Sequence, residues 1–168
     1  MTVTIDDVKD YWNRQPCNVK HSKKDVGTVE YFDEVERKRY TAEPHIPAFA
    51  DFASWKGKKV LEVGCGLGTE GINFARAGAK YTATDLSSES LNLARQRFSV
   101  YNQKGDFYLG NSEELTSFLP RQKFDLIYSF GVIHHSPNPG KIFDQIYEYM
   151  DDDSILKIML YAKDSWKG

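Results

Sequence analysis

The sequence has few features of secreted, membrane or nucleic-acid-binding proteins. Its 168 residues include only two cysteines, Cys17 and Cys65, which are too few for a disulfide framework. No N-terminal apolar run is long enough for a signal peptide or a membrane span. Basic residues do not dominate either, because the net charge is −2 and charges of both signs are interspersed. These absences predict a cytoplasmic protein without nucleic-acid or membrane partners.

What is present suits one compact domain. The chain is 40% apolar and 14% aromatic, which is enough for a buried core to offset the entropy lost on folding. The four histidines do not stand at metal-ligand spacing from the two cysteines, so we expect no metal ion.

Periodicity separates a helical N-terminal segment from a region of alternating strands and helices. Thr4 is a candidate N-cap for a first short helix, and a second helix is predicted through VEYFDEVERKRYTAE, before Pro44. After Gly57, short apolar runs predict strands at KVLEV, KYTATD, DFYLG, FDLIYSF and SILKIMLY. Helices are predicted between them, through EGINFARAG, SESLNLARQRFSVYN and GKIFDQIYEYM. This alternation predicts an α/β fold with a doubly wound, mostly parallel sheet and helices on both faces.

A glycine-rich turn follows the first predicted strand. Gly64, Gly66 and Gly68 allow a sharp bend and leave bare backbone outside the carboxyl end of that strand, where ligands of such sheets bind. Gly66, Gly68 and Gly71 spell GxGxxG, and Asp85 follows at the end of the second strand. This spacing also fits a nicotinamide dinucleotide, whose ribose an acid receives.

Two carboxylates beside the turn favour a different ligand. Glu62 lies in the first strand and Glu70 in the first turn of the next helix. A pyrophosphate needs a positive helix end, whereas a ligand carrying an ammonium and a sulfonium group is attracted by carboxylates.

The same residues resemble the class I S-adenosylmethionine-dependent methyltransferases. VLEVGCGLGT with TDLS is similar to the first two motifs of that superfamily. FDLIYSFGVIHHSPNP is similar to the fourth-strand motif of its small-molecule branch, the methyltransferase type 11-like proteins. The resemblance covers residues 57–160. It implies a Rossmann-like fold that binds S-adenosylmethionine, methylates a small-molecule acceptor and releases S-adenosylhomocysteine.

The resemblance also implies individual roles around the cofactor. Asp85 is expected to accept the ribose hydroxyls, Leu86 to line the adenine, and Asn111 and Ser112 to lie beside the same ring. Asn111 stands where many relatives carry an aspartate. The remaining predicted cofactor-binding residues are Glu62, Gly64, Cys65, Gly66, Gly68 and Phe130.

Several of these residues have structural alternatives. Asp85 is also typical of a helix cap, although Ser87 suits that position as well. Glu62 is also typical of a solvated strand end, and Asn111 of a turn. His134 and His135 follow the fourth strand and are candidate general bases, because imidazole titrates near neutrality. Their alternative is packing within the loop HHSPNP.

Domain organisation and assembly follow from the same resemblance. Residues 1–56 are expected to form a helical lid on the substrate side of an S-adenosylmethionine-binding core, residues 57–168. Only five strands are readable, so the usual C-terminal strands are expected to be missing. An apolar fifth strand with a free edge makes a homodimer possible. Two other functions stay open: a cofactor-binding module without activity, truncated or partner-dependent, and a nicotinamide-dependent oxidoreductase.

Overall fold

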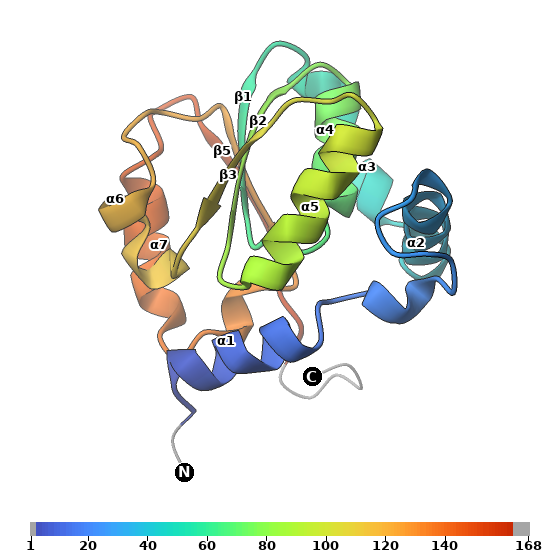
Figure 1. Ribbon diagram of the computed structural model, residues 1–168. Helices are drawn as coiled ribbons and strands as arrows, with labels where there is room; N and C mark the ends of the chain where they lie inside the picture. The colour runs from blue at the N-terminus through green and yellow to red at the C-terminus, as the bar shows by residue number, and fades with distance from the viewer. Residues whose placement is uncertain (1–2, 163–168) are drawn as a thin grey trace.

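The computed structural model describes residues 3–162 and is organised around one parallel sheet (Figure 1). Its strands lie in the order β3-β2-β1-β4-β5, and every neighbouring pair is parallel. The strands are β1 (Lys59–Val63), β2 (Lys80–Asp85), β3 (Asp106–Leu109), β4 (Leu126–Phe130) and β5 (Ile155–Met159). From β1 the chain adds β2 and β3 on one side, and it then crosses to the other side of β1 to add β4 and β5, as in a doubly wound fold. The five predicted strands and their parallel pairing are confirmed.

Helices cover both faces of the sheet (Figure 1). One apolar core joins one face to α3 (Ile46–Ala50), α4 (Thr69–Arg76) and α5 (Ser88–Val100). A second core joins the opposite face to α6 (Leu115–Phe118) and α7 (Pro139–Tyr147). The sequence analysis missed α3 and α6, which are too short to show helical periodicity. Within residues 3–162, no helix is long and apolar enough to cross a membrane.

The first helix, α1 (Ile5–Arg14), lies across the carboxyl ends of the strands (Figure 1). It begins with a capping box, in which Asp7 N–H donates to Thr4 Oγ1 at 3.2 Å and Thr4 N–H donates to the Asp7 carboxylate at 2.9 Å. None of its residues is buried. The predicted cap and helix are therefore confirmed, and α1 is attached to the surface of the core.

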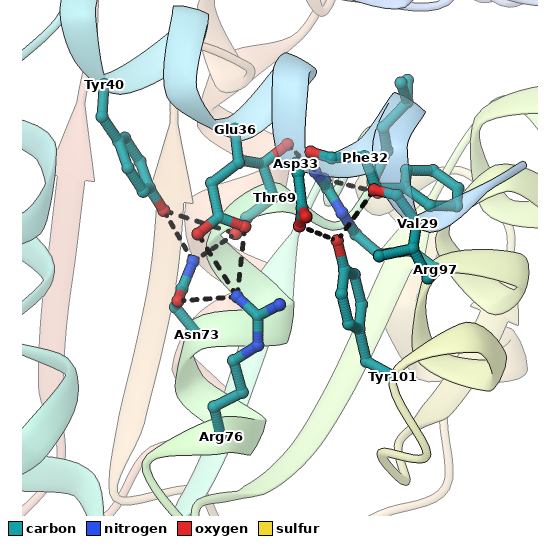
Figure 2. A network of polar contacts seen from close by, with 11 residues as sticks. Val29, Phe32, Asp33, Glu36, Tyr40, Thr69, Asn73, Arg76, Arg97 and Tyr101 are labelled. Atoms are coloured by element: carbon teal, nitrogen blue, oxygen red, sulfur yellow. Dashed lines mark hydrogen bonds and ion pairs between the residues drawn. The ribbon is translucent and has the colours of Figure 1, made fainter. Parts of the chain in front are cut away.

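The second helix, α2 (Val29–Ala42), is fixed to the core by polar contacts (Figure 2). Arg97 of α5 donates to the Phe32 carbonyl oxygen at 2.7 Å, and Tyr101 Oη contacts the Asp33 carboxylate. Arg76 of α4 pairs with Glu36 at 3.3 Å. These contacts attach α2 to the core beside α4 and α5.

Gly71 shows why a glycine follows the turn. A Cβ at this position of α4 would lie 2.2 Å from Tyr81 Oη of β2. The same hydroxyl donates a hydrogen bond to Glu62 at 2.5 Å. Close packing between α4 and the sheet therefore requires the third glycine of the GxGxxG pattern.

Candidate cofactor-binding and active site

A cavity lies between α1 and the carboxyl ends of the strands. Apolar side chains of α1, Ile5, Val8 and Trp12, form part of its wall. Ten predicted site residues line it: Glu62, Gly64, Cys65, Gly66, Asp85, Leu86, Asn111, Ser112, Phe130 and His135. Gly68 and His134 are not among the lining residues. The parallel sheet thus brings together residues that are far apart in the sequence.

The turn after β1 presents bare backbone to this cavity. Gly66 has a φ of +51°, and a Cβ built on it would meet no atom within 4 Å. A side chain there would occupy open space above the turn. Gly68 instead forms the N-cap of α4, and its Cβ position faces the Ala94 side chain at 3.2 Å. Packing against α5 explains Gly68 without a ligand contact.

Asp85 is held at the end of β2 with 9% of its surface exposed. Its two carboxylate oxygens accept hydrogen bonds from Gly66 N–H and Ser87 N–H, each at 2.8 Å. Ser87, whose hydroxyl accepts from Ser90 N–H, is the N-cap of α5, so helix capping does not explain Asp85. Burial raises the pKa of Asp85, and the backbone hydrogen bonds oppose this shift. Both oxygens keep a free lone pair for further donors.

Glu62 is a buried acid and not a solvated strand end, with only 2% of its surface exposed. Tyr81 Oη donates a hydrogen bond to its Oε2. Burial, followed by the nearby Glu70 carboxylate, raises the pKa of Glu62 well above its ordinary value. The structure therefore places Glu62 inside the protein beside the turn, with its carboxyl group hydrogen-bonded to Tyr81.

Arg39 of α2 lines the cavity, although the sequence analysis did not identify it. Its Nε donates to Glu70 at 3.2 Å, and its Nη1 contacts Glu43. Glu70 is therefore paired with a cation at the start of α4, which the sequence analysis did not predict. Arg39 shares a helix face with buried Phe32 and Val35. A cation on the apolar face of a predicted helix indicates a buried ion pair or a site, and this signal could have identified Arg39.

The loop after β4 places His135 at the cavity and His134 away from it. The His135 ring meets Trp12 of α1 edge-on, with centroids 5.4 Å apart. His134 packs against Tyr161 at 5.1 Å, and among the described residues its ring nitrogens have no hydrogen-bond partner. Desolvation lowers the pKa of both imidazoles. Within residues 3–162, neither histidine belongs to a group of three potential metal ligands.

Asn111 turns the chain after β3 and also lines the cavity. Its Oδ1 accepts a hydrogen bond from Glu113 N–H at 3.0 Å, which caps the 3₁₀ turn Ser112–Glu114. The turn role is therefore present in the structure. Among the described residues no other partner occupies this side chain, so one acceptor position on Oδ1 and both amide N–H groups are available to a ligand.

Comparison with known proteins identifies relatives of the chain. A family profile described as a methyltransferase domain matches residues 61–156. The ubiquinone biosynthesis O-methyltransferase of Aromatoleum aromaticum is 34% identical over 88 residues, which are 52% of this chain and 37% of that protein. The protein of the same name from Dechloromonas aromatica is 36% identical over 89 residues, covering 53% and 38%. The match therefore spans less than two fifths of each relative.

Solved structures share the fold at lower identity. Magnesium protoporphyrin IX methyltransferase from Synechocystis, solved with bound S-adenosylmethionine, has a TM-score of 0.65 at 20% identity, covering 88% of this chain and 72% of that one. The cyclase SpnF has a TM-score of 0.69 at 18% identity, covering 100% and 64%. One fold thus carries proteins named for different reactions, so fold alone does not decide the chemistry. The family profile, which covers more than half of the chain, shows that the chain belongs to the methyltransferase domain family.

Proposed function

We propose that this chain binds S-adenosylmethionine in the cavity and transfers its methyl group to a hydroxyl oxygen of a small molecule. Asp85 carries this proposal, because it faces the cavity beside the bare backbone of residues 64–66. A carboxylate offers two oxygens to a vicinal diol such as a ribose. Family membership supports the methyl transfer, and the names of the O-methyltransferase relatives support an oxygen acceptor.

The remaining lining residues fit the parts of such a cofactor. Residues 64–66 would hold its methionine part, and the Arg39 guanidinium its carboxylate. Leu86, Asn111 and Ser112 would lie along the adenine. When bound, S-adenosylmethionine supplies a methyl group on a positively charged sulfonium.

The protein itself then has two tasks, to position the acceptor and to remove its proton. An in-line displacement depends mainly on alignment, which the walls of the cavity beside α1 would provide. A hydroxyl acceptor also loses a proton. His135 is the base that the geometry favours, because its ring lies in the cavity wall and its lowered pKa keeps it neutral.

The cofactor itself gives the first test. S-adenosylmethionine or S-adenosylhomocysteine at about one hundred times its dissociation constant should stabilise the fold by about 2.7 kcal/mol. Thermal melting would register this shift, and a nicotinamide dinucleotide at the same concentration should give none. A shift with the dinucleotide alone would favour the oxidoreductase. Stabilisation without transfer to any acceptor would favour the inactive binding module.

Asp85→Asn tests the ribose contact. The amide keeps the shape of the side chain but turns an NH₂ group toward one of its two backbone donors. We expect S-adenosylhomocysteine to bind about tenfold more weakly, which corresponds to losing hydrogen bonds to a charged acceptor. Calorimetry would measure this against Asp106→Asn, an exposed aspartate on β3. Equal affinity in both variants would show that Asp85 does not contribute to binding of S-adenosylhomocysteine.

Other expectations from the sequence remain proposals. We propose that α1, and not the whole of residues 1–56, acts as the lid of the site. A homodimer is proposed through β5, which in the described part of the chain pairs only with β4. A cytoplasmic location and the absence of nucleic-acid partners also stay predictions.

A further inference from the structure

Glu113 is a buried acid between the two loops that line the cavity from β3 and β4. Only 8% of its surface is exposed, and it directly follows Asn111 and Ser112 in the chain. Buried carboxylates are rare unless donors surround them. The cavity itself does not use Glu113, which is not among the lining residues.

Within residues 3–162, the hydrogen-bond donors to the Glu113 carboxylate come from the loop after β4. Oε1 accepts from Ser136 Oγ at 2.5 Å and from Asn138 N–H at 3.2 Å. Oε2 accepts from Asn138 Nδ2 at 3.2 Å. Burial works to raise the pKa of Glu113, but these hydrogen bonds outweigh it and the pKa falls below its ordinary value. Glu113 is therefore ionised at neutral pH and bonded through both oxygens.

The residues at the two ends of this contact reach the cavity. Ser136 lines it, and so does His135, the residue before Ser136. On the other side, Asn111 and Ser112 line it as well. Glu113 N–H also donates to Asn111 Oδ1, so the same residue orients the side chain of Asn111.

We propose that Glu113 is a positioning residue. Through its hydrogen bonds to Ser136 and Asn138 it fixes His135 relative to the loop with Asn111 and Ser112, which would lie along the adenine. This assignment rests on the proposed function in one respect, because it takes the cavity as the cofactor site. Charged hydrogen bonds on both oxygens hold the loop before any ligand arrives, so that less ordering is needed on binding. A purely structural role would stabilise the fold without any effect on His135 or on ligand affinity.

Glu113→Gln separates these two roles, with Glu114→Gln as the matched control. Glutamine keeps the size of the side chain, but its NH₂ group faces donors of Ser136 or Asn138. Glu114 is the exposed neighbour, and in the described residues its carboxylate has no hydrogen bond or ion pair. The first measurement is the NMR spectrum of the ligand-free protein, in which the ring signals of His135 and Trp12 should move in Glu113→Gln only.

The second measurement is the affinity for S-adenosylhomocysteine by calorimetry. We expect Glu113→Gln to weaken it about tenfold and Glu114→Gln to leave it unchanged. Ser136→Ala removes the short contact from the other side and serves if Glu113→Gln does not fold. In the double variant the two losses should not add, since both break one contact.

Two results would overturn the proposal. One is a lower melting temperature in Glu113→Gln with His135 signals and affinity like the wild type. The other is full additivity with Ser136→Ala. If the wild-type protein itself does not bind S-adenosylhomocysteine, the proposed function fails, and the ligand-free spectra still decide whether Glu113 positions His135.

Discussion

Replacing Arg97 by methionine is expected to lower the free energy of unfolding by about 3 kcal/mol or more. Arg97 is fully buried, and its guanidinium donates to Phe32 of α2 and to two oxygens of the segment that opens α4 (Figure 2). Those oxygens are the Leu67 carbonyl at 3.2 Å and Thr69 Oγ1 at 2.5 Å. Methionine fills similar space but leaves all three acceptors without this donor. Urea denaturation would measure the loss.

Arg95→Met is the matched control for this prediction. Arg95 lies on the same helix, is exposed, and donates to the Phe107 carbonyl oxygen at 3.0 Å and to Asn92 Oδ1 at 3.5 Å. We expect its loss to stay within about 1 kcal/mol. Burying a cation is costly, so an apolar replacement is sometimes neutral. Unchanged or higher stability in Arg97→Met would mean that this cost exceeds the three hydrogen bonds.

Replacing His135 by glutamine is expected to slow methyl transfer about a hundredfold while cofactor affinity changes little. Glutamine preserves the size of the ring contact with Trp12 approximately, but it cannot accept a proton. The wild-type rate should fall as the pH drops through the pKa of His135, which lies below the ordinary histidine value. This acid limb should vanish in His135→Gln. Transfer of labelled methyl groups to a panel of phenols would give both rates.

His134→Gln is the comparison for the base. His134 lies outside the cavity wall and packs on Tyr161, so its replacement should leave most of the rate. A large loss in His134→Gln with a normal rate in His135→Gln would exchange their roles. Full activity in both variants would leave positioning alone to carry the reaction.

Local signals predicted the fold well because each worked over a few residues. Thr4 caps a helix through its own hydroxyl, and the apolar run of β1 is buried on both faces, so neither depends on distant parts of the chain. The short helices α3 and α6 were missed because they lack such a local signal. Each is too short for its periodicity to show, and tertiary packing holds it in place.

The sequence predicted those residues of the candidate site that follow directly after a strand. It did not predict those that reach the site through contacts between distant segments. Residues 64–66 and Asp85 follow directly from the order of strand and turn. Arg39 and Glu113 do not, because their importance comes from partners such as Glu70 and Ser136, whose proximity the sequence alone does not show. The sequence also did not show which of His134 and His135 faces the cavity, because the conformation of the loop that carries them has no periodic pattern.

The hydroxyl of Tyr81 occupies the volume that a Cβ at Gly71 would need, and this links positions 62, 71 and 81 in sequence variation. A homologue that gains a methyl group at 71 must lose bulk at 81. Phenylalanine at 81 is not small enough, because the Cβ would also lie 2.4 Å from Cζ of the ring. A smaller residue at 81 also removes the donor to the buried carboxyl at 62. We therefore expect these three positions to change together among homologues, with a neutral residue at 62 wherever 71 is not glycine.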